Sequence, residues 1–179
     1  MMNVKSMIKG QLMSGCDPAQ ALFRVNQNIC GENQSMMFVT VWLAVLKLST
    51  GEVLACNAGH ENPGFRPAGE AFSLLKYKHN LAVGVMENTR YQNREFVLQP
   101  NDTLFVYTDG VTEAINDAQQ MFGEERLKET LNQEADESPE KIIHRVLDTV
   151  DRFAENTPQF DDITMLSFRY YGNDRGCNT

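Results

Sequence analysis

Two acidic positions at the ends of apolar segments have the clearest potential for chemistry in this sequence. Asp109 follows the apolar residues 104–107 after a single threonine, Thr108, and Asp161 and Asp162 stand directly before a second apolar segment, residues 163–168. Both segments have the composition of buried strands. If these strands are antiparallel neighbours, the end of one meets the start of the other, and the carboxylates converge at one edge of a sheet. Because Mg and Mn prefer oxygen ligands, the pattern indicates a divalent metal site.

Each acidic position also has an interpretation without a metal. Asp109 could be a turn residue or the cap of a short helix that starts at Val111, and Gly110 would then simply allow a sharp turn. Asp161 and Asp162 could be a solvated pair at the junction of a loop and a strand, although like charges repel unless something neutralises them. Of this pair we expect Asp161 to be the ligand and Asp162 to lie outside the ligand set or in a turn.

The elements that must position these acids can be predicted from hydrophobic periodicity and turn residues. The first dozen residues have helical spacing, and a second helix begins after the N-cap Asp17 and ends near Gly31. Residues 37–48 predict a long strand buried on both faces for much of its length. The later elements are a strand at 52–57, a short hairpin over 65–75, strands at 91–98, 104–107 and 163–168, a helix at 123–131, and a helix after the N-cap Ser138. This order predicts the α+β class, with helices that cover the faces of antiparallel sheets.

Composition excludes several other classes of protein. The 179 residues are 42% hydrophobic, which suits a single domain over residues 1–172 followed by a frayed tail at 173–179. A formal charge of -8 argues against nucleic acid and anionic lipid as partners. No segment approaches the roughly 20 apolar residues of a membrane-spanning helix. The four cysteines show no CxxC spacing, so we expect reduced thiols and a cytoplasmic location.

Five motifs occur in the order known from one protein family. Together they resemble the catalytic domain of SpoIIE/RsbU-type bacterial serine phosphatases, which belong to the metal-dependent PPM (PP2C-like) protein phosphatases. The resemblance covers nearly the whole chain. The motifs are Asn57-Ala58-Gly59-His60 with Pro63, Leu81 with Gly84-Val85, Tyr107-Thr108-Asp109-Gly110-Val111-Thr112-Glu113-Ala114, Phe122-Gly123 with Arg126-Leu127, and Asp161-Asp162-Ile163-Thr164.

The resemblance implies a sandwich of two antiparallel β-sheets flanked by helices, with two Mn or Mg ions at one edge. It implies hydrolysis of phosphoserine or phosphothreonine by a metal-activated water, without a phosphoenzyme. Asp109 and Asp161 would be metal ligands, and Gly110 would let the backbone turn away from the metals. His60 could act as a general acid, but a turn histidine is the favoured interpretation because Gly-His-x-x-Pro suits a turn.

The sequence also departs from the family pattern. The family has two further motifs upstream, Gly-Asp-x-Tyr-Asp and Asp-x-Ser-Gly-x-Gly, and this sequence contains no Gly-Asp dipeptide at all. We therefore expect that the chain begins inside the domain and that the fold is incomplete at its N-terminus. Asp109 and Asp161 alone would hold at most one ion, weakly, so this polypeptide would have little or no phosphatase activity. The strands missing from the sheets would expose edges that could pair with a second copy, forming a homodimer.

The resemblance further implies a phosphorylated protein as the substrate, such as a phosphorylated anti-sigma-factor antagonist. Two other functions remain open at this stage. One is a non-catalytic, pseudophosphatase-like interaction module that keeps the fold and binds a partner without turnover. The other is a metal-free structural domain, in which Asp109 and Asp161 would lie too far apart to share an ion.

Overall fold

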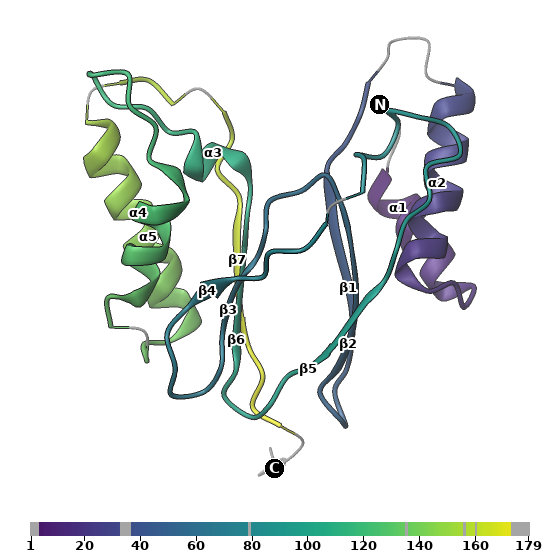
Figure 1. Cartoon of the computed structure of the whole chain (residues 1–179), viewed down its shortest axis with the longest axis horizontal. Coiled ribbons are helices and arrows are strands. Elements are labelled where there is room, and N and C mark those ends of the chain that lie inside the picture. Colours follow the sequence, from purple (N-terminus) through teal and green to yellow (C-terminus); the bar gives the residue numbers. More distant parts are fainter. Residues whose placement is uncertain are drawn as a thin grey trace. The chain divides into compact units, whose positions relative to one another are not determined.

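A computed structural model describes residues 4–32, 37–78, 80–134, 136–155, 157–159 and 161–172. Helices and antiparallel strands follow one another along this part of the chain, so the predicted α+β class is confirmed (Figure 1). The predicted tail at 173–179 lies outside the described residues. The chain divides into two compact units: Met1–His60 with Tyr77–Val97, and Glu61–Lys76 with Leu98–Thr179.

The first unit is built on a three-stranded antiparallel sheet with the order β1-β2-β5. The strands are β1 (Val41–Lys47), β2 (Glu52–Ala58) and β5 (Arg94–Val97). Gly51 makes the tight turn between β1 and β2 with a φ of 75°, a conformation that glycine adopts without a steric penalty. The resulting hairpin pairs Val41 with Ala58 at one end and Lys47 with Glu52 at the other.

Two helices, α1 (Val4–Met13) and α2 (Pro18–Glu32), pack beside each other, and α2 contacts β1 and β2 (Figure 1). Asp17 caps α2 as predicted, because its carboxylate accepts the Gln20 N–H at 2.9 Å. The fully buried side chains of Leu22 and Val25 form one apolar face of α2. That face packs against Cys56 and other core residues of the unit, so the hydrophobic stripe read from the sequence is the contact surface.

The prediction that the strand over 37–48 is buried on both faces is wrong. In the structure β1 covers only Val41–Lys47, and its side chains are half-buried or exposed. Val41 and Leu43 pack against the core cluster of the first unit, whereas Val45, farther along the strand, is 44% exposed. An apolar sequence shows that a strand can be buried, but which part is covered depends on how far the helices extend over it.

The second unit is built on a four-stranded antiparallel sheet with the order β4-β3-β6-β7. Its strands are β3 (Gly64–Arg66), β4 (Ser73–Leu74), β6 (Thr103–Tyr107) and β7 (Met165–Arg169). The register pairs Tyr107, at the end of β6, with Met165, at the start of β7. The predicted antiparallel pairing of the two apolar segments is therefore confirmed.

Three helices belong to the second unit: α3 (Asp109–Thr112), α4 (Gly123–Asn132) and α5 (Pro139–Ala154). Ser138 caps α5 as predicted, because its hydroxyl accepts the Lys141 N–H at 3.4 Å. α5 packs against both α4 and β7. The core of this unit contains ten buried residues from strands and helices: Phe72, Phe105, Tyr107, Val111, Phe122, Leu127, Leu131, Ile142, Val146 and Val150.

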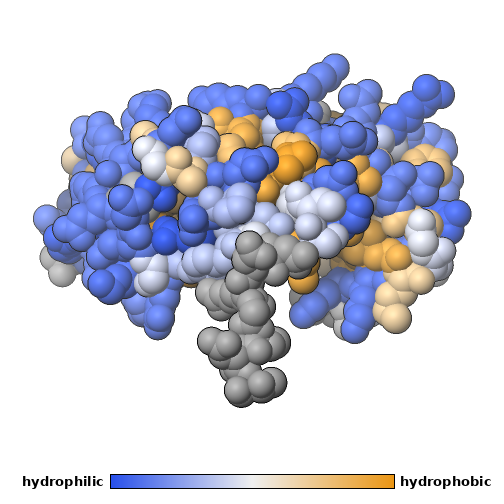
Figure 2. Space-filling view, turned by 90° about the horizontal axis from the view of Figure 1, so that it is seen from below, coloured by the Kyte–Doolittle hydropathy of each residue, from blue (hydrophilic) through white to orange (hydrophobic). Residues whose placement is uncertain are grey.

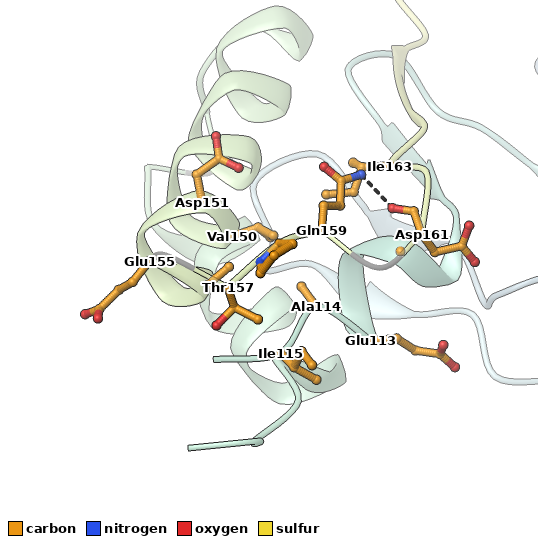
Figure 3. A pocket seen from close by; sticks show the side chains of 13 residues that line it. Glu113, Ala114, Ile115, Val150, Asp151, Glu155, Thr157, Gln159, Asp161 and Ile163 are labelled. Atoms are coloured by element: carbon orange, nitrogen blue, oxygen red, sulfur yellow. Dashed lines mark hydrogen bonds between the residues drawn. The ribbon is translucent and has the colours of Figure 1, made fainter. Parts of the chain in front are cut away.

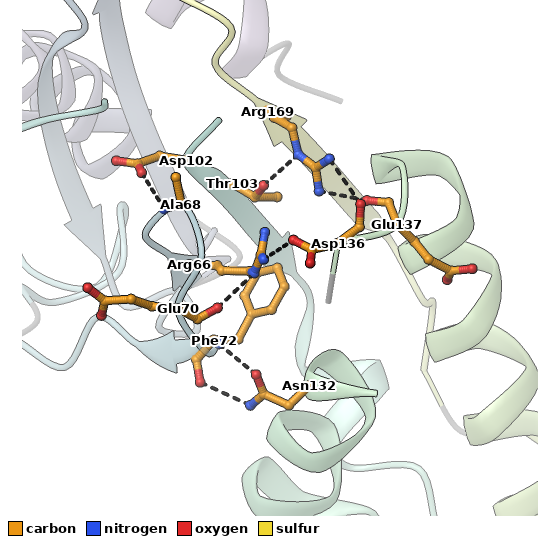
Figure 4. A network of polar contacts seen from close by, with 10 residues as sticks. All are labelled: Arg66, Ala68, Glu70, Phe72, Asp102, Thr103, Asn132, Asp136, Glu137 and Arg169. Carbon is orange, nitrogen blue, oxygen red and sulfur yellow. Dashed lines mark hydrogen bonds and ion pairs between the residues drawn. The ribbon is translucent and has the colours of Figure 1, made fainter. Parts of the chain in front are cut away.

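A polar network joins the β3–β4 hairpin of the second unit to its neighbours (Figure 4). Buried Arg66 donates to the Glu70 carbonyl at 2.8 Å and forms an ion pair with Asp136. Asp102, which is only 3% exposed, accepts the N–H groups of Ala68 and Gln99 at 2.8 Å each. Because the buried side chains of Arg66 and Asp102 would be costly without partners, this network fixes the chain at one end of the sheet.

The surface seen in Figure 2 is mainly hydrophilic, with smaller hydrophobic areas between the polar side chains. Among the described residues, the exposed large hydrophobic side chains include Leu48, Val97 and Leu166. None of the helices in this described part combines the length and the hydropathy needed to cross a bilayer.

Candidate metal centre

The end of β6 and the segment before β7 lie against each other in the second unit. The Thr108 N–H donates to the Thr164 carbonyl at 3.0 Å, continuing the strand pairing by one residue. The Thr108 hydroxyl accepts the Thr164 N–H at 2.9 Å and donates to the Asp162 carbonyl at 2.9 Å. These three bonds bring the segment that contains Asp161 to the start of α3, which begins at Asp109.

Gly110 makes this approach close. A Cβ placed on Gly110 would lie 2.6 Å from the Asp162 carbonyl oxygen and 3.2 Å from that of Asp161. Real Cβ atoms essentially never come within 3.0 Å of such an atom. The contact between the two segments therefore requires a glycine at position 110, whatever backbone conformation the turn needs.

The two aspartates have the same local arrangement. Asp109 Oδ1 accepts the N–H of Gly110 at 3.0 Å, and Asp161 Oδ1 accepts the N–H of Asp162 at 2.7 Å. Each carboxylate is thus held at one oxygen by the next residue of the chain, which reduces the rotamer freedom that a ligand would otherwise lose on binding. Asp109 is half-buried, whereas Asp161 and Asp162 are exposed.

Further acidic side chains surround Asp109. Burial raises the pKa of Glu61, and the nearby carboxylates of Glu124, Asp109 and Glu113 raise it further. Burial also raises the pKa of Tyr107, and its buried hydroxyl has no hydrogen-bond partner in the described part of the chain. The region therefore carries several negative charges at short range, and a bound cation would relieve their repulsion.

The oxygen-rich chemistry of this region suits a hard divalent cation, but the ligand set is small. Within residues 4–172, leaving aside the few that the structure does not describe, no group of three or more His, Cys, Asp or Glu side chains is arranged to hold a metal ion. The assignment of Asp109 and Asp161 as metal ligands therefore stays a prediction.

His60 lies in the first unit, whereas Asp109 and Asp161 lie in the second. Asn57, which is only 1% exposed, holds the backbone of His60 at both polar groups: its Oδ1 accepts the His60 N–H and its Nδ2 donates to the His60 carbonyl, each at 2.8 Å. These two bonds fix the main chain of His60 and do not involve its imidazole, so the interpretation as a turn histidine stays a prediction. A catalytic role for the imidazole stays a prediction.

Two residues at this site are not predicted from the sequence. Thr108 is part of a motif there, whereas in the structure its hydroxyl forms two of the bonds that join the segments. Glu61 is an acid next to His60 in the first motif, and this position is the signal in the sequence that could identify it. In both cases the partners are distant in sequence, so residue types alone did not reveal them.

Comparison with known proteins places the chain in a family. The family model for Stage II sporulation protein E (SpoIIE) matches residues 1–171. Protein IcfG from Synechocystis sp. is 34% identical over 143 residues, which cover 79% of this chain and 22% of that protein. Phosphoserine phosphatase RsbU from Bacillus subtilis is 24% identical over 170 residues, covering 92% of this chain and 50% of RsbU. The chain thus spans half or less of the length of these two relatives.

Solved structures confirm the fold. The SiaA-PP2C domain of Pseudomonas aeruginosa superposes with a TM-score of 0.78 at 22% identity, covering 93% of this chain and 66% of that one. The manganese-presoaked phosphatase domain of SpoIIE from Bacillus subtilis gives a TM-score of 0.67 at 16% identity, covering 97% of this chain and 76% of that one. The architecture is therefore PP2C-like. Because the family model matches almost the whole sequence, the chain belongs to the SpoIIE (Stage II sporulation protein E) family.

Proposed function

We propose that this chain is part of a Mn- or Mg-dependent protein serine/threonine phosphatase domain, in which Asp109 and Asp161 supply two carboxylate ligands of the metal centre. One observation carries the proposal: the Asp161–Asp162 segment packs directly on Gly110, the residue after Asp109. Two acids 52 positions apart in sequence are thereby brought to one edge of one sheet. The family membership and the oxygen-only chemistry of the region support the same assignment.

The residues of this chain would position the metal ligands and supply the negative charge of the site. Thr108 joins the two segments through its hydroxyl and its backbone, and Gly110 allows their close contact. Asp109 and Asp161 would hold the metal, and Asp162, whose carbonyl accepts from Thr108, would stabilise the loop. When bound, such metals supply Lewis acidity and a more acidic water for attack on a phosphate ester.

We further propose that the 179-residue polypeptide by itself has little phosphatase activity. Two carboxylates are fewer than a two-metal centre needs, and the described residues contain no group of three metal-binding side chains. A single ion would be held weakly, because Mg and Mn sites with few protein ligands depend on other groups to complete their coordination.

The proposed substrate is a phosphoserine or phosphothreonine in another protein, such as a phosphorylated anti-sigma-factor antagonist. RsbU, a phosphoserine phosphatase by its printed name, supports this choice of phosphoester. Homodimer formation through an unpaired sheet edge is a further part of the proposal, because strand edges readily pair with another chain.

Manganese titration of the purified chain, followed by calorimetry and by the EPR signal of free Mn, tests the metal site. We expect at most one ion per chain, weakly bound, and loss of that ion in Asp109→Asn and in Asp161→Asn. Asp148→Asn, which removes an exposed carboxylate elsewhere on α5, is the matched control and should leave the titration unchanged. Equal binding by wild type and Asp109→Asn would overturn the assignment of Asp109.

Hydrolysis of p-nitrophenyl phosphate and of a phosphoserine peptide in the presence of Mn tests the expected low activity. We expect rates close to those of a metal-only blank. A rate well above the blank that disappears in Asp109→Asn would show that the chain is a working enzyme, which would refute the low activity but support the metal site.

A binding module without turnover is the second candidate function. The observation that favours it is the small ligand set among the described residues. Such a module need not bind Mn at all. A flat Mn titration together with retained folding would favour this candidate over the phosphatase.

A further inference from the structure

A small cavity lies beside the candidate metal centre in the second unit, and it shares two residues with that centre (Figure 3). Gly110 and Asp161 line one side of it. The remainder is lined by the C-terminal part of α5, by the residues that follow it, and by the segment after α3. Its volume is about 150 Å³, which is the scale of a cavity that can hold one benzene-sized apolar group.

The inside of this cavity is mainly apolar. Ala114, Ile115, Val150, Pro158 and Ile163 all line it. Val150 belongs to the buried core of the second unit, and Ala114 and Ile163 pack against that core, so the cavity floor continues the core surface. Contact of such an apolar floor with an aliphatic group has a lower free energy than its contact with water.

The rim of the cavity is acidic. Glu113, Asp151, Glu155 and Asp161 are all exposed, and none of the lining residues is a lysine or an arginine. Figure 3 shows their carboxylates at the periphery, turned away from the centre of the cavity. A fifth acid, Asp117, lies directly behind, since its carboxylate accepts a hydrogen bond from the Thr157 hydroxyl at 2.8 Å. The rim therefore favours cationic groups that lie around the cavity and not inside it.

We propose that this cavity binds one aliphatic side chain of a substrate protein, such as leucine or methionine, within a segment whose neighbouring residues are basic. The aliphatic side chain would fill the apolar cavity, and lysine or arginine side chains on either side of it would face the rim carboxylates of Glu113, Asp151 and Glu155. The inference rests on the proposed function for its location, because Gly110 and Asp161 would place this segment next to the phosphorylated residue.

The charge of the chain itself helps to choose the occupant. At -8 the chain is strongly acidic, so a second copy would bring mostly like charge to an acidic rim. A basic segment of a different protein is therefore the better match in charge as well as in shape.

The test uses short peptides without phosphate, in buffer without metal, so that binding is measured separately from catalysis. Acetylated Lys-Leu-Lys, Lys-Gly-Lys and Glu-Leu-Glu amides are titrated into the isotope-labelled chain and followed by NMR. We expect Lys-Leu-Lys to shift the amide signals of Ala114, Val150 and Ile163 with a dissociation constant on the order of 1 mM, as suits a ligand of this size. Lys-Gly-Lys should bind about tenfold more weakly or worse, because it lacks the aliphatic group.

Two variants probe the cavity and its rim separately. Ala154→Phe places a ring on a lining position and should abolish the shifts. The double variant Asp151→Lys with Glu155→Lys changes only exposed side chains and should weaken Lys-Leu-Lys about threefold to tenfold. Asp148→Lys, also exposed on α5 but not part of the lining, is the matched control and should bind as wild type does.

The outcomes distinguish this proposal from the metal site. Equal binding of Lys-Leu-Lys and Lys-Gly-Lys would overturn the proposal that the cavity binds an aliphatic side chain. Equal binding of Lys-Leu-Lys and Glu-Leu-Glu would overturn the proposal that the rim carboxylates favour basic residues. Equal binding of Lys-Leu-Lys by the double variant and by Asp148→Lys would overturn it as well. Neither result depends on Mn, and the effect of Asp109→Asn on Mn binding does not depend on these peptides. Each proposal can therefore fail while the other stands.

Discussion

Replacement of Gly110 by alanine tests the central contact of the candidate metal centre. The new methyl group would lie 2.6 Å from the Asp162 carbonyl oxygen and 3.0 Å from its carbonyl carbon. Both atoms belong to the backbone, so no side-chain rotation can make room. The segment that carries Asp161 must move, or β6 and β7 must shift at their joined ends.

The expected loss of stability follows from overpacking. Forcing extra volume into a tightly packed site typically costs about 1–3 kcal/mol. For a protein of this length each kcal/mol corresponds to about 2–4 °C in Tm, so Gly110→Ala should lower Tm by about 2–12 °C. Gly10→Ala is the matched control, because Gly10 lies within α1 and a Cβ there would meet nothing within 4 Å. Alanine in a helix should stabilise the chain by about 0.5–1 kcal/mol.

Thermal unfolding followed by circular dichroism, together with the Mn titration described above, measures both effects. We expect Gly110→Ala to lose stability and Mn binding together, since the same displacement separates Asp161 from Asp109. The reasoning is refuted if Gly110→Ala unfolds within about 0.5 kcal/mol of wild type while Gly10→Ala shows its expected gain.

Three further predictions concern other parts of the chain. Asp102→Ala should cost about 1–3 kcal/mol in urea unfolding, because the backbone N–H groups of Ala68 and Gln99 lose the carboxylate that accepts from them; an unfolding free energy equal to that of wild type would contradict the role of that network. Ser138→Ala should cost about 1 kcal/mol through loss of the α5 N-cap, measured in the same way. Burial raises the pKa of Cys56 to about 11, so its thiolate should form only at strongly alkaline pH. Iodoacetamide at pH 8, read by peptide mass spectrometry, should therefore modify half-buried Cys16 well before Cys56. The Cys56 thiol ionises at a lower pH in the unfolded chain than in the folded one. The free energy of unfolding should therefore fall as pH rises from about 9 towards 11.

The elements and their neighbours were largely predictable because they rest on local signals. The N-caps Asp17 and Ser138 depend on hydrogen bonds with residues three positions along the chain, and the structure confirms both. The antiparallel pairing of β6 with β7 followed from two apolar segments with acids at matching ends, and the register of Tyr107 with Met165 confirms it. The burial of β1 could not be predicted in the same way, because it depends on contacts with residues distant in sequence: Val41 and Leu43 pack against the core cluster of the first unit, whereas Val45 is exposed.

The site was predictable in its acids but not in what holds them. Asp109 and Asp161 stood out because carboxylates are unusual at the ends of apolar strands. The contact between Thr108 and Asp162 joins residues 54 positions apart, and no local pattern in the sequence reports it. Gly110 was assigned to turn freedom, a local property, whereas the structure shows that a steric contact with a distant segment requires it.

The acidic surroundings of Asp109 suggest that this end of the sheet is arranged for binding rather than for stability. Burial raises the pKa of Glu61, and the nearby carboxylates of Glu124, Asp109 and Glu113 raise it further. Like charges at such short range destabilise a folded protein unless a cation is present. Thr108 and Gly110 also bring a further acidic pair, Asp161 and Asp162, to the start of α3, which begins at Asp109. A structure that keeps mutually repelling groups close is expected where a positively charged ligand offsets the repulsion. The same argument extends to the cavity beside it, where a rim of carboxylates surrounds an apolar floor that is the right size for one side chain.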